Sequence, residues 1–349
     1  MRRYLACNVF ISEAHSAAVL AQVQTHLTSH RAALLFHFKD AIYNRSSFLL
    51  AAPLVAQPTA ADTHKDQRHS PELLGGVLQA SRYLWKHLSL EGHQATHPRV
   101  GLIDHISVHP LGDSTLGDAL AHAQAVGKAL GEECGIPVFM YGAPVYGTLV
   151  DARRRTRRYF SHDAADQDQP LCSDFGPSVW DPRTGVAVVG AVPWFTAFNL
   201  PFTVKSNDAA ILRRVKDAML GVREKRGGLH GVHALILDHG NQGRHENDDS
   251  TAAAEGVFFG ADGTRVPLRL PAVPSGPSPL YELACNVYWE GTGSHRDVRA
   301  IISAKAREVV ESAGLGECVG WGEGYVIGFD SSGAILKAAT DLFERGGGN

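Results

Sequence analysis

The chain has 349 residues, which is longer than one typical domain and fits two. Its formal net charge of −3 excludes a general attraction to nucleic acid or to an anionic membrane. No stretch is apolar for long enough to span a membrane, and residues 1–7 hold no secretory hydrophobic region. The five cysteines are scattered and form no C-x-x-C pair. We therefore expect a reducing compartment, cytoplasmic or organellar, with no disulfide framework and no metal site.

The first half alternates short apolar runs with amphipathic stretches, which predicts strands and helices in turn. Pro71 is expected to open a helix, where its missing N–H costs nothing. Ser114 or Thr115 is expected to cap a long helix that ends at Gly135. The predicted strands are residues 4–10, 33–38, 47–52, 106–109 and 138–141, and the predicted helices are residues 17–26, a segment from residue 71, 116–133 and 151–160.

The second half predicts the β-α-β-β-α-β order of a ferredoxin-like lobe. Its expected elements are strand 194–200, helix 208–224, strands 232–237 and 280–288, helix 296–312, strand 324–329 and a last helix at 332–343. Residues 239–279, rich in Asn, Asp, Gly, Pro and Ser, separate the two central strands and read as a surface loop or small hairpin. The predicted fold class is α+β with two lobes, divided near residues 185–190.

One pentapeptide, Leu-Ala-Cys-Asn-Val, occurs twice, at residues 5–9 and 283–287. It falls on the first predicted strand of one half and on a middle strand of the other. The repeat is therefore not taken as evidence that one half duplicates the other.

The segment T-H-P-R-V-G at residues 96–101 places a histidine directly before a proline, with Asp104 close behind. Pro98 keeps His97 out of the helical region and stiffens it. A histidine held rigidly at a turn, with Arg99 two residues on, could serve as a general base near neutral pH. With 18 histidines in the chain, a surface or core-edge histidine is the alternative that spacing alone favours.

Two other segments could bind a ligand. The segment D-F-G-P at residues 174–177 leads through Trp180 to Gly185; its glycines allow close approach of a flat ligand, and Trp180 could stack on a ring. Composition alone favours an ordinary linker there. The basic run at residues 153–158 could grip phosphates or an acidic tail such as polyglutamate, although a solvated helix face is favoured.

Taken together, these segments resemble the formiminotransferase family. H-P-R-V-G at 97–101, followed by Asp104, resembles the family's H-P-R-x-G-x-x-D motif. P-V at 137–138 with Y-G at 141–142 resembles its P-V-x-x-Y-G strand, and D-F-G-P at 174–177 resembles its D-F-G-P segment. G-A at 190–191 with A-F-N at 197–199 resembles its G-A-R…A-[FY]-N strand. S-E at 12–13 and N-R at 44–45 match two shorter pieces. The order and spacing agree along nearly the whole chain.

The resemblance implies an N-terminal subdomain at residues 1–188 and a C-terminal subdomain at residues 189–349, the latter with the insertion 239–279. Each subdomain is expected to hold a mixed or antiparallel sheet covered by helices. The two sheets are expected to face each other across a folate tunnel, and two chains to form a homodimer through the N-terminal subdomain.

The family reaction moves a formimino group from N-formiminoglutamate to N5 of tetrahydrofolate, so the expected partners are a reduced folate and a glutamate-type donor. His97 inherits the role of general base, with Arg99, Asp104, Asn44 and Asn199 as supporting residues. The folate-contacting loop corresponds to Gly176, Pro177, Ser178, Val179, Trp180, Asp181, Pro182, Arg183, Thr184 and Gly185. Because the folate amine is itself the nucleophile, the reaction needs no metal and no Ser or Cys attacker.

Four departures from the family pattern remove polar groups. Phe10 replaces an asparagine, residues 36–41 lose two carboxylates unless Asp40 substitutes, Ala143 replaces a glutamate, and Val192 replaces an arginine. The changes resemble a divergent branch found in photosynthetic eukaryotes, and the family's fused cyclodeaminase domain is not expected. A formyl donor, or 5-formyltetrahydrofolate as the folate, is the next variation considered. The alternative function is a catalytically inactive homologue that acts as a folate-binding or structural subunit of a larger complex.

Overall fold

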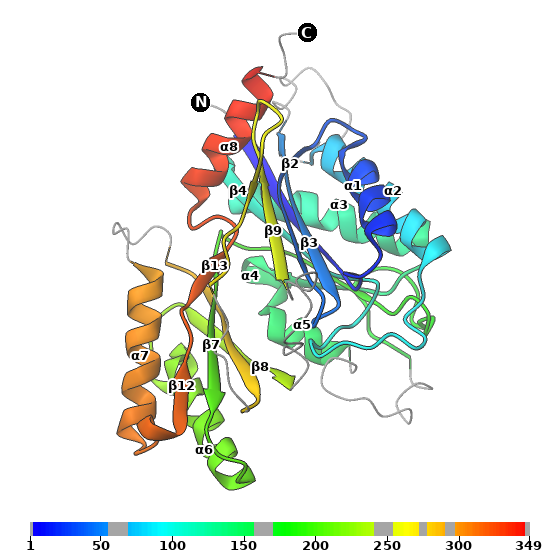
Figure 1. The fold of residues 1–349 in the computed structure, drawn as a ribbon. Helices are drawn as coiled ribbons and strands as arrows, with labels where there is room; N and C mark the ends of the chain where they lie inside the picture. The colour runs from blue at the N-terminus through cyan, green and yellow to red at the C-terminus, as the bar shows by residue number, and fades with distance from the viewer. Residues whose placement is uncertain are drawn as a thin grey trace. The chain divides into compact units, whose positions relative to one another are not determined.

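The computed structural model describes residues 3–54, 69–156, 170–240, 254–271, 278–289 and 297–345. The chain forms two compact units, each built on one β-sheet (Figure 1). The first unit comprises Met1–Pro193, Val257–Val266 and Gly333–Asn349, and the second comprises Trp194–Gly256 and Pro267–Ser332. The predicted α+β class is confirmed. The subdomain boundary between residues 188 and 189 stays a prediction.

The first unit holds an eight-stranded mixed sheet with the order β10-β9-β2-β3-β1-β4-β6-β5. β1 pairs antiparallel with β3 and β4, and β2 pairs antiparallel with β3, whereas β6 runs parallel to β4 and β5. The strands are β1 Arg3–Ile11, β2 Ala33–Asp40, β3 Arg45–Pro53, β4 Ile103–Gly112, β5 Val138–Gly142, β6 Ala187–Ala191, β9 Ala254–Phe259 and β10 Arg265–Pro267.

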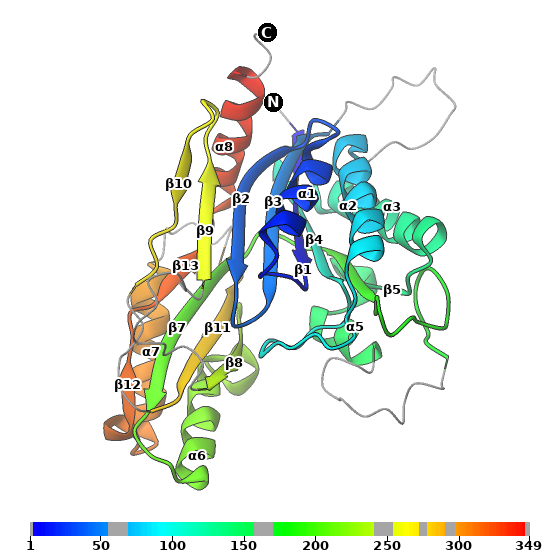
Figure 2. The same cartoon turned by 45° about the vertical axis from the view of Figure 1, so that its right-hand side comes forward.

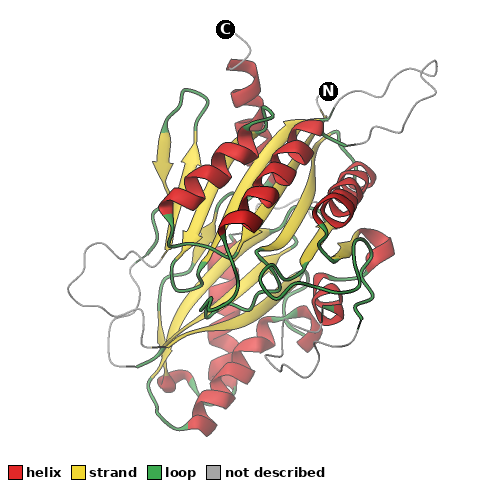
Figure 3. Ribbon diagram, turned by 90° about the vertical axis from the view of Figure 1, so that its right-hand side faces the viewer, coloured by secondary structure: helices red, strands yellow, loops and turns green. Residues whose placement is uncertain are grey.

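Three helices cover one face of this sheet: α1 Ala17–Thr28, α2 Pro71–His87 and α3 Leu116–Cys134 (Figures 2 and 3). Each begins at a hydroxyl cap that accepts a backbone N–H, and the caps are Ser16, Ser70 and Thr115. Gly135 ends α3 in the left-handed conformation, as predicted. The buried apolar side chains of β1, β3 and β4 alternate along each strand and face these helices.

The intervening residues of the same strands face the other way. They include Asn8 and Phe10 on β1 and His105, Ser107 and His109 on β4, so this face is polar and aromatic. Helix α5 Leu149–Arg155, which follows the short α4 Ala143–Tyr146, packs against β5 and β6 on this side through Ala152. This second face of the first sheet carries the candidate site.

The second unit confirms the predicted ferredoxin-like order. Its sheet runs β12-β7-β11-β8, with β13 also pairing β7, and each of these pairings is antiparallel. Helices α6 and α7 pack their apolar residues against one face. The elements are β7 Thr196–Val204, α6 Ala209–Met219, β8 Val232–Gly240, β11 Leu280–Val287, α7 Val298–Ser312, β12 Val319–Trp321 and β13 Tyr325–Ile327, with short 3-10 turns at Leu220–Val222, Glu224–Arg226 and Gly316–Cys318.

The first unit contains the same strand order. Its β1, α1, β2, β3, α2 and β4 follow one another along the chain and give a sheet order β2-β3-β1-β4, as in the second unit. The repeated pentapeptide lies on β1, the first strand of one pattern, and on β11, the third strand of the other. The pentapeptide therefore does not mark equivalent strands, as expected, even though the two topologies agree.

Several elements differ from prediction. The expected helix 208–224 ends at Met219, the closing strand is split into β12 and β13, and the strand β6 was not predicted. The described part of the 239–279 insertion forms β9 and β10, which join the first sheet, and α8 Ser332–Arg345 also packs in the first unit, with Phe343 5.7 Å from the Tyr4 ring. Arg157, Arg158 and the remainder of the insertion, residues 241–253 and 272–277, lie outside the described residues.

Within the part of the chain that the structure describes, no helix combines the length and the apolar character needed to cross a membrane.

Close packing of α1 on α2 depends on Gly76. A Cβ added there would lie 2.3 Å from the Leu27 carbonyl oxygen. Because that oxygen belongs to the backbone of α1, the clash can be relieved only by a shift of one helix against the other. Gly76→Ala should lower the free energy of unfolding by about 1–3 kcal/mol. Gly117→Ala in α3 is the matched control because its Cβ would meet nothing closer than 3.5 Å, and it should raise stability by up to about 1 kcal/mol. Urea denaturation measures both; equal effects would contradict the packing argument.

His122 on α3 should make stability depend on pH. Its side chain is fully buried and accepts the Ser70 N–H, and burial lowers its pKa from 6.5 to about 3. Between pH 6.5 and 3 the unfolded chain binds a proton that the folded chain does not, so stability falls with falling pH by about 1.4 kcal/mol per unit. His122→Asn should remove that part of the slope in urea titrations at pH 6 and 5. Parallel slopes in the two proteins would refute the assignment.

Candidate functional site

The imidazole of His97 lies between a guanidinium and a backbone carbonyl. Its Nδ1 is 2.6 Å from Pro98 O, and Arg45 Nη1 is 2.9 Å from Nδ1 and 3.0 Å from Nε2. A carbonyl oxygen only accepts and a guanidinium only donates. The contact with the carbonyl favours the tautomer that carries the proton on Nδ1, which then donates to Pro98 O, while Arg45 Nη1 lies almost equally far from the two ring nitrogens. In that tautomer Nε2 is the ring nitrogen that can accept an N–H from Arg45.

Arg45 is itself held on three sides. Its Nη2 forms an ion pair with Asp104 Oδ2 at 2.7 Å, and its guanidinium lies over the Phe10 ring, 4.6 Å from the centroid. The Asp104 side chain is only 1% exposed, and its Oδ1 accepts the Val100 N–H at 2.7 Å. Asp104 therefore fixes both the arginine and the backbone three residues beyond His97.

Asn44 and Arg99 hold the loop that carries His97. Asn44 adopts a left-handed φ of 44°, accepts the Ala14 N–H at 3.0 Å and donates to Gln94 O at 3.1 Å. Arg99 donates to His93 O, and burial lowers its pKa, partly offset by the charge of Asp104. Both predicted supporting residues thus connect the His97 loop to neighbouring backbone.

Two histidines, His105 and His109, lie on the second face of the first sheet. His105 stacks on Phe10, with ring centroids 5.2 Å apart, and its Nε2 is 2.6 Å from the Tyr141 hydroxyl. Burial, followed by the charges of Arg153 and Arg45, holds the pKa of His105 well below 6.5, so it is neutral at pH 7. His109 contacts Ser107 Oγ at 2.9 Å, and burial lowers its pKa to about 4.

Sequence reasoning missed this histidine pair. A signal was present, because His105, Ser107 and His109 alternate with the apolar Ile106 and Val108 over five residues. In a strand that period places all three polar side chains on one face.

The predicted folate loop, residues 176–185, is joined to the His97 segment. Gly101 and Gly185 form a β-bridge, Leu102 N donates to Thr184 O at 2.9 Å, and Val186 N donates to Val100 O at 2.9 Å. The two backbones come so close that a Cβ on Gly185 would lie 2.3 Å from Val100 O. The predicted base and the end of the predicted cofactor loop therefore belong to one tightly packed assembly.

Within that loop the ten residues differ in exposure. Gly176 to Val179, Pro182 and Arg183 are exposed, and the Val179 side chain is 71% exposed. Trp180 is 9% exposed and packs among core residues that include Val100 and Tyr141. The ring-stacking role considered for Trp180 stays a prediction, and its described position is in the core. Asp181 and Arg183 pair with each other at 2.7 Å.

The fourth supporting residue, Asn199, belongs to the second unit. Its Nδ2 donates to Glu282 Oε2 at 2.9 Å, and Tyr325 Oη donates to Glu282 Oε1 at 2.7 Å. His239 Nε2 lies 3.2 Å from Glu282 Oε2, and all four residues are buried. Asn199 is thus part of a buried polar cluster of its own unit.

The positions where the sequence departs from the family pattern have other contacts. Phe10 lies between Arg45 and His105, and Asp40 Oδ1 caps the β2–β3 turn by accepting the Tyr43 N–H at 2.9 Å. Ala143 adopts a left-handed φ of 43°, and Val192 is half-buried beside the Tyr141 cluster. Asn8 lies two residues before Phe10 on β1, so both side chains are on the same face of the sheet. This face of β1 therefore carries an asparagine, although Phe10 stands where the family pattern has one.

Among the described residues, no group of three or more His, Cys, Asp and Glu side chains is placed to hold a metal ion.

Loss of Arg45 should be costly because Asp104 is buried. Arg45→Met should lower the free energy of unfolding by about 3–5 kcal/mol, since it leaves a carboxylate without its partner. The double variant Arg45→Met/Asp104→Asn should recover part of that loss. Arg82→Met is the control, because the Arg82–Glu133 pair has the same 2.7 Å distance but is half exposed, and its loss should cost less than about 1 kcal/mol. Similar losses in both single variants would contradict the argument.

Known proteins support the family implied by these motifs. Residues 4–192 match the model of the formiminotransferase domain, N-terminal subdomain. The chain is 29% identical over 245 residues to a formiminotransferase cyclodeaminase-like protein of Arabidopsis thaliana, covering 67% of this chain and 77% of that protein. It is 30% identical over 154 residues to a glutamate formimidoyltransferase of Thermoplasma acidophilum, covering 43% of this chain and 49% of that protein. A formimidoyltransferase-cyclodeaminase of Sus scrofa is 31% identical over 131 residues, 37% of this chain and 24% of that protein. Because the family model matches more than half of the chain, the chain belongs to the formiminotransferase family.

Proposed function

We propose that the protein is a folate-dependent one-carbon transferase that moves a formimino or formyl group between glutamate and N5 of tetrahydrofolate, with His97 as the general base. Two relatives are named as formimidoyltransferases, which supports a reaction of this type. The folate substrate, the glutamate-type donor and the homodimer are parts of the proposal.

The observation that carries the proposal is the pair of contacts that the His97 ring makes with Pro98 O and with Arg45. In the tautomer whose Nδ1–H donates to Pro98 O, Nε2 carries the lone pair that can accept a proton. A general base must be unprotonated and oriented before the reaction starts. The hydrogen bond to Pro98 holds the ring in one orientation and favours that tautomer, which supports His97 as the base.

The Arg45 guanidinium must move before His97 can accept a proton from a substrate, because Arg45 Nη1 lies 3.0 Å from His97 Nε2. Its other contacts allow this: Nη2 stays on Asp104 and the guanidinium face stays over Phe10. A small rotation about these contacts would free Nε2 and turn Nη1 toward the reacting group. Arg45 would then stabilise negative charge that develops on the transferred group.

Residues on this face fit a reduced folate. When bound, tetrahydrofolate supplies the N5 amine that attacks the donor. Asn8 Oδ1 is buried without a hydrogen-bond partner among the described residues, on the same face as Phe10 and His105. A pterin ring carries N–H donors that such an oxygen would accept. The exposed backbone of residues 176–179 offers further groups for the folate.

His97→Ala should abolish transfer while the fold survives. Loss of a general base typically lowers turnover by about 10²–10⁴-fold. The measurement is formimino transfer from N-formiminoglutamate to tetrahydrofolate, with calorimetric titration of 5-formyltetrahydrofolate on the same proteins. His87→Ala, at the exposed end of α2, is the matched control and should keep full activity. Full activity of the His97 variant would overturn the assignment of the base.

The binding measurement separates the two functions considered. Saturable folate binding with no transfer by the unaltered protein would favour the catalytically inactive folate-binding homologue. Absence of both binding and transfer, in a folded protein, would remove the folate assignment altogether.

A further inference from the structure

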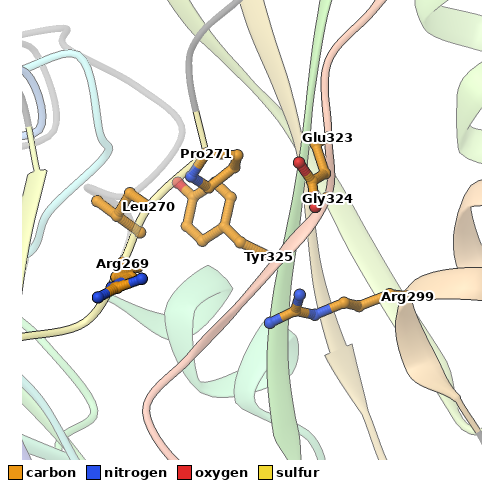
Figure 4. A pocket seen from close by; sticks show the side chains of 7 residues that line it. All are labelled: Arg269, Leu270, Pro271, Arg299, Glu323, Gly324 and Tyr325. Carbon is orange, nitrogen blue, oxygen red and sulfur yellow. The ribbon is translucent and has the colours of Figure 1, made fainter.

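An open cavity of about 310 Å³ is lined by residues of the second unit, whereas His97 belongs to the first (Figure 4). Its walls come from three segments: the stretch after β10, the first turn of α7, and the residues that lead into β13. At roughly 30 Å³ per water in the liquid, the volume equals that of about ten waters. That is the size of a small metabolite or of one end of a larger one. The lining residues are Arg269, Leu270, Pro271, Arg299, Glu323, Gly324 and Tyr325.

The cavity is cationic. Arg269 and Arg299 line it from different segments, and Figure 4 shows the Arg299 side chain reaching from α7 toward the Tyr325 side of the cavity. Both arginines are exposed, and neither guanidinium has an ion pair or a hydrogen bond among the residues that the structure describes. Two other arginines of this unit have partners: Arg226 pairs with Asp217 and Arg307 lies over Trp321. With Glu323 as the one acidic lining residue, the cavity carries a formal charge of +1 in a chain of charge −3.

The wall on the Tyr325 side is rigid. Gly324 packs so closely that a Cβ there would lie 2.3 Å from the Phe198 ring, and Gly322 N donates to Pro201 O at 2.8 Å. Tyr325 is 7% exposed, and its hydroxyl is fixed on the buried Glu282 carboxylate. On the opposite wall, Leu268 N donates to Gly256 O at 2.7 Å, and this hydrogen bond restrains the backbone next to Arg269. When a cavity is already formed, the protein loses little conformational entropy as a ligand binds.

We infer that this cavity is a binding site for a small oxyanion, a phosphate or a carboxylate, held between Arg269 and Arg299. Two guanidiniums from different segments suit an anion with two or more oxygens, because each can donate two parallel N–H groups. Glu323 limits the charge that the cavity accepts, so a ligand with one or two negative charges fits better than a polyanion. The inference is independent of the transfer reaction proposed for His97.

The test is calorimetric titration of the full chain with inorganic phosphate and, separately, with glutarate, at constant ionic strength. Saturable binding of either anion is expected, weakened about tenfold by Arg299→Ala or Arg269→Ala, because each removes charge-assisted hydrogen bonds. Glu323→Gln should tighten binding. Arg213→Ala is the matched control, since it removes an exposed arginine on α6 and should leave the affinity unchanged.

The two probes identify the source of the anion. Binding of phosphate alone would indicate a phosphorylated ligand, and binding of glutarate alone would indicate a carboxylic acid. Circular dichroism of each variant shows that the fold is kept. No saturable binding of either anion, or binding that Arg269→Ala and Arg299→Ala both leave unchanged, would overturn the inference.

Discussion

The geometry of the first unit depends on one buried cation, the guanidinium of Arg45. It opens β3, yet its contacts reach β1 through Phe10, β4 through Asp104 and the preceding loop through His97. Asp104 extends the same connection to the Val100 backbone, and the Gly101–Gly185 bridge extends it to the predicted folate loop. A charge that is desolvated in this way needs its partner, so the positions of the surrounding segments are mutually dependent.

Much of this could be predicted from the sequence because the signals are local. Apolar periodicity, hydroxyl caps and Gly135 predicted the helices α1, α2 and α3 and most of the strands. The order of elements in the second half was enough to predict a ferredoxin-like sheet. His97, Arg99 and Asp104 were found through one motif, Asn199 through the G-A-R…A-[FY]-N strand, and Asn44 through a shorter piece. The structure assigns these residues contacts, and their roles in catalysis stay a proposal.

What could not be predicted depends on pairing between distant segments. Strand β6 lies between β4 and β5 in the sheet, although it follows both along the chain, and the boundary between the two lobes was expected near residues 185–190, where β6 begins. The importance of Arg45 follows from a contact with Asp104 across the sheet, which no local pattern reveals. His105, Ser107 and His109 were visible as an alternation, but only the sheet shows that they share a face with Phe10 and Asn8.

The hairpin β9–β10 and helix α8 belong to the first unit although they are encoded after most of the second. During synthesis, chains emerge from the N-terminus and domains generally fold as units. Here β2 would remain an exposed sheet edge, able to pair with other chains, until residues 257–266 have left the ribosome. The ring of Tyr4 would likewise lack its neighbour Phe343 until the last helix appears. The first unit therefore completes its fold last, and a truncation after Pro193 would leave an open edge rather than a separate domain.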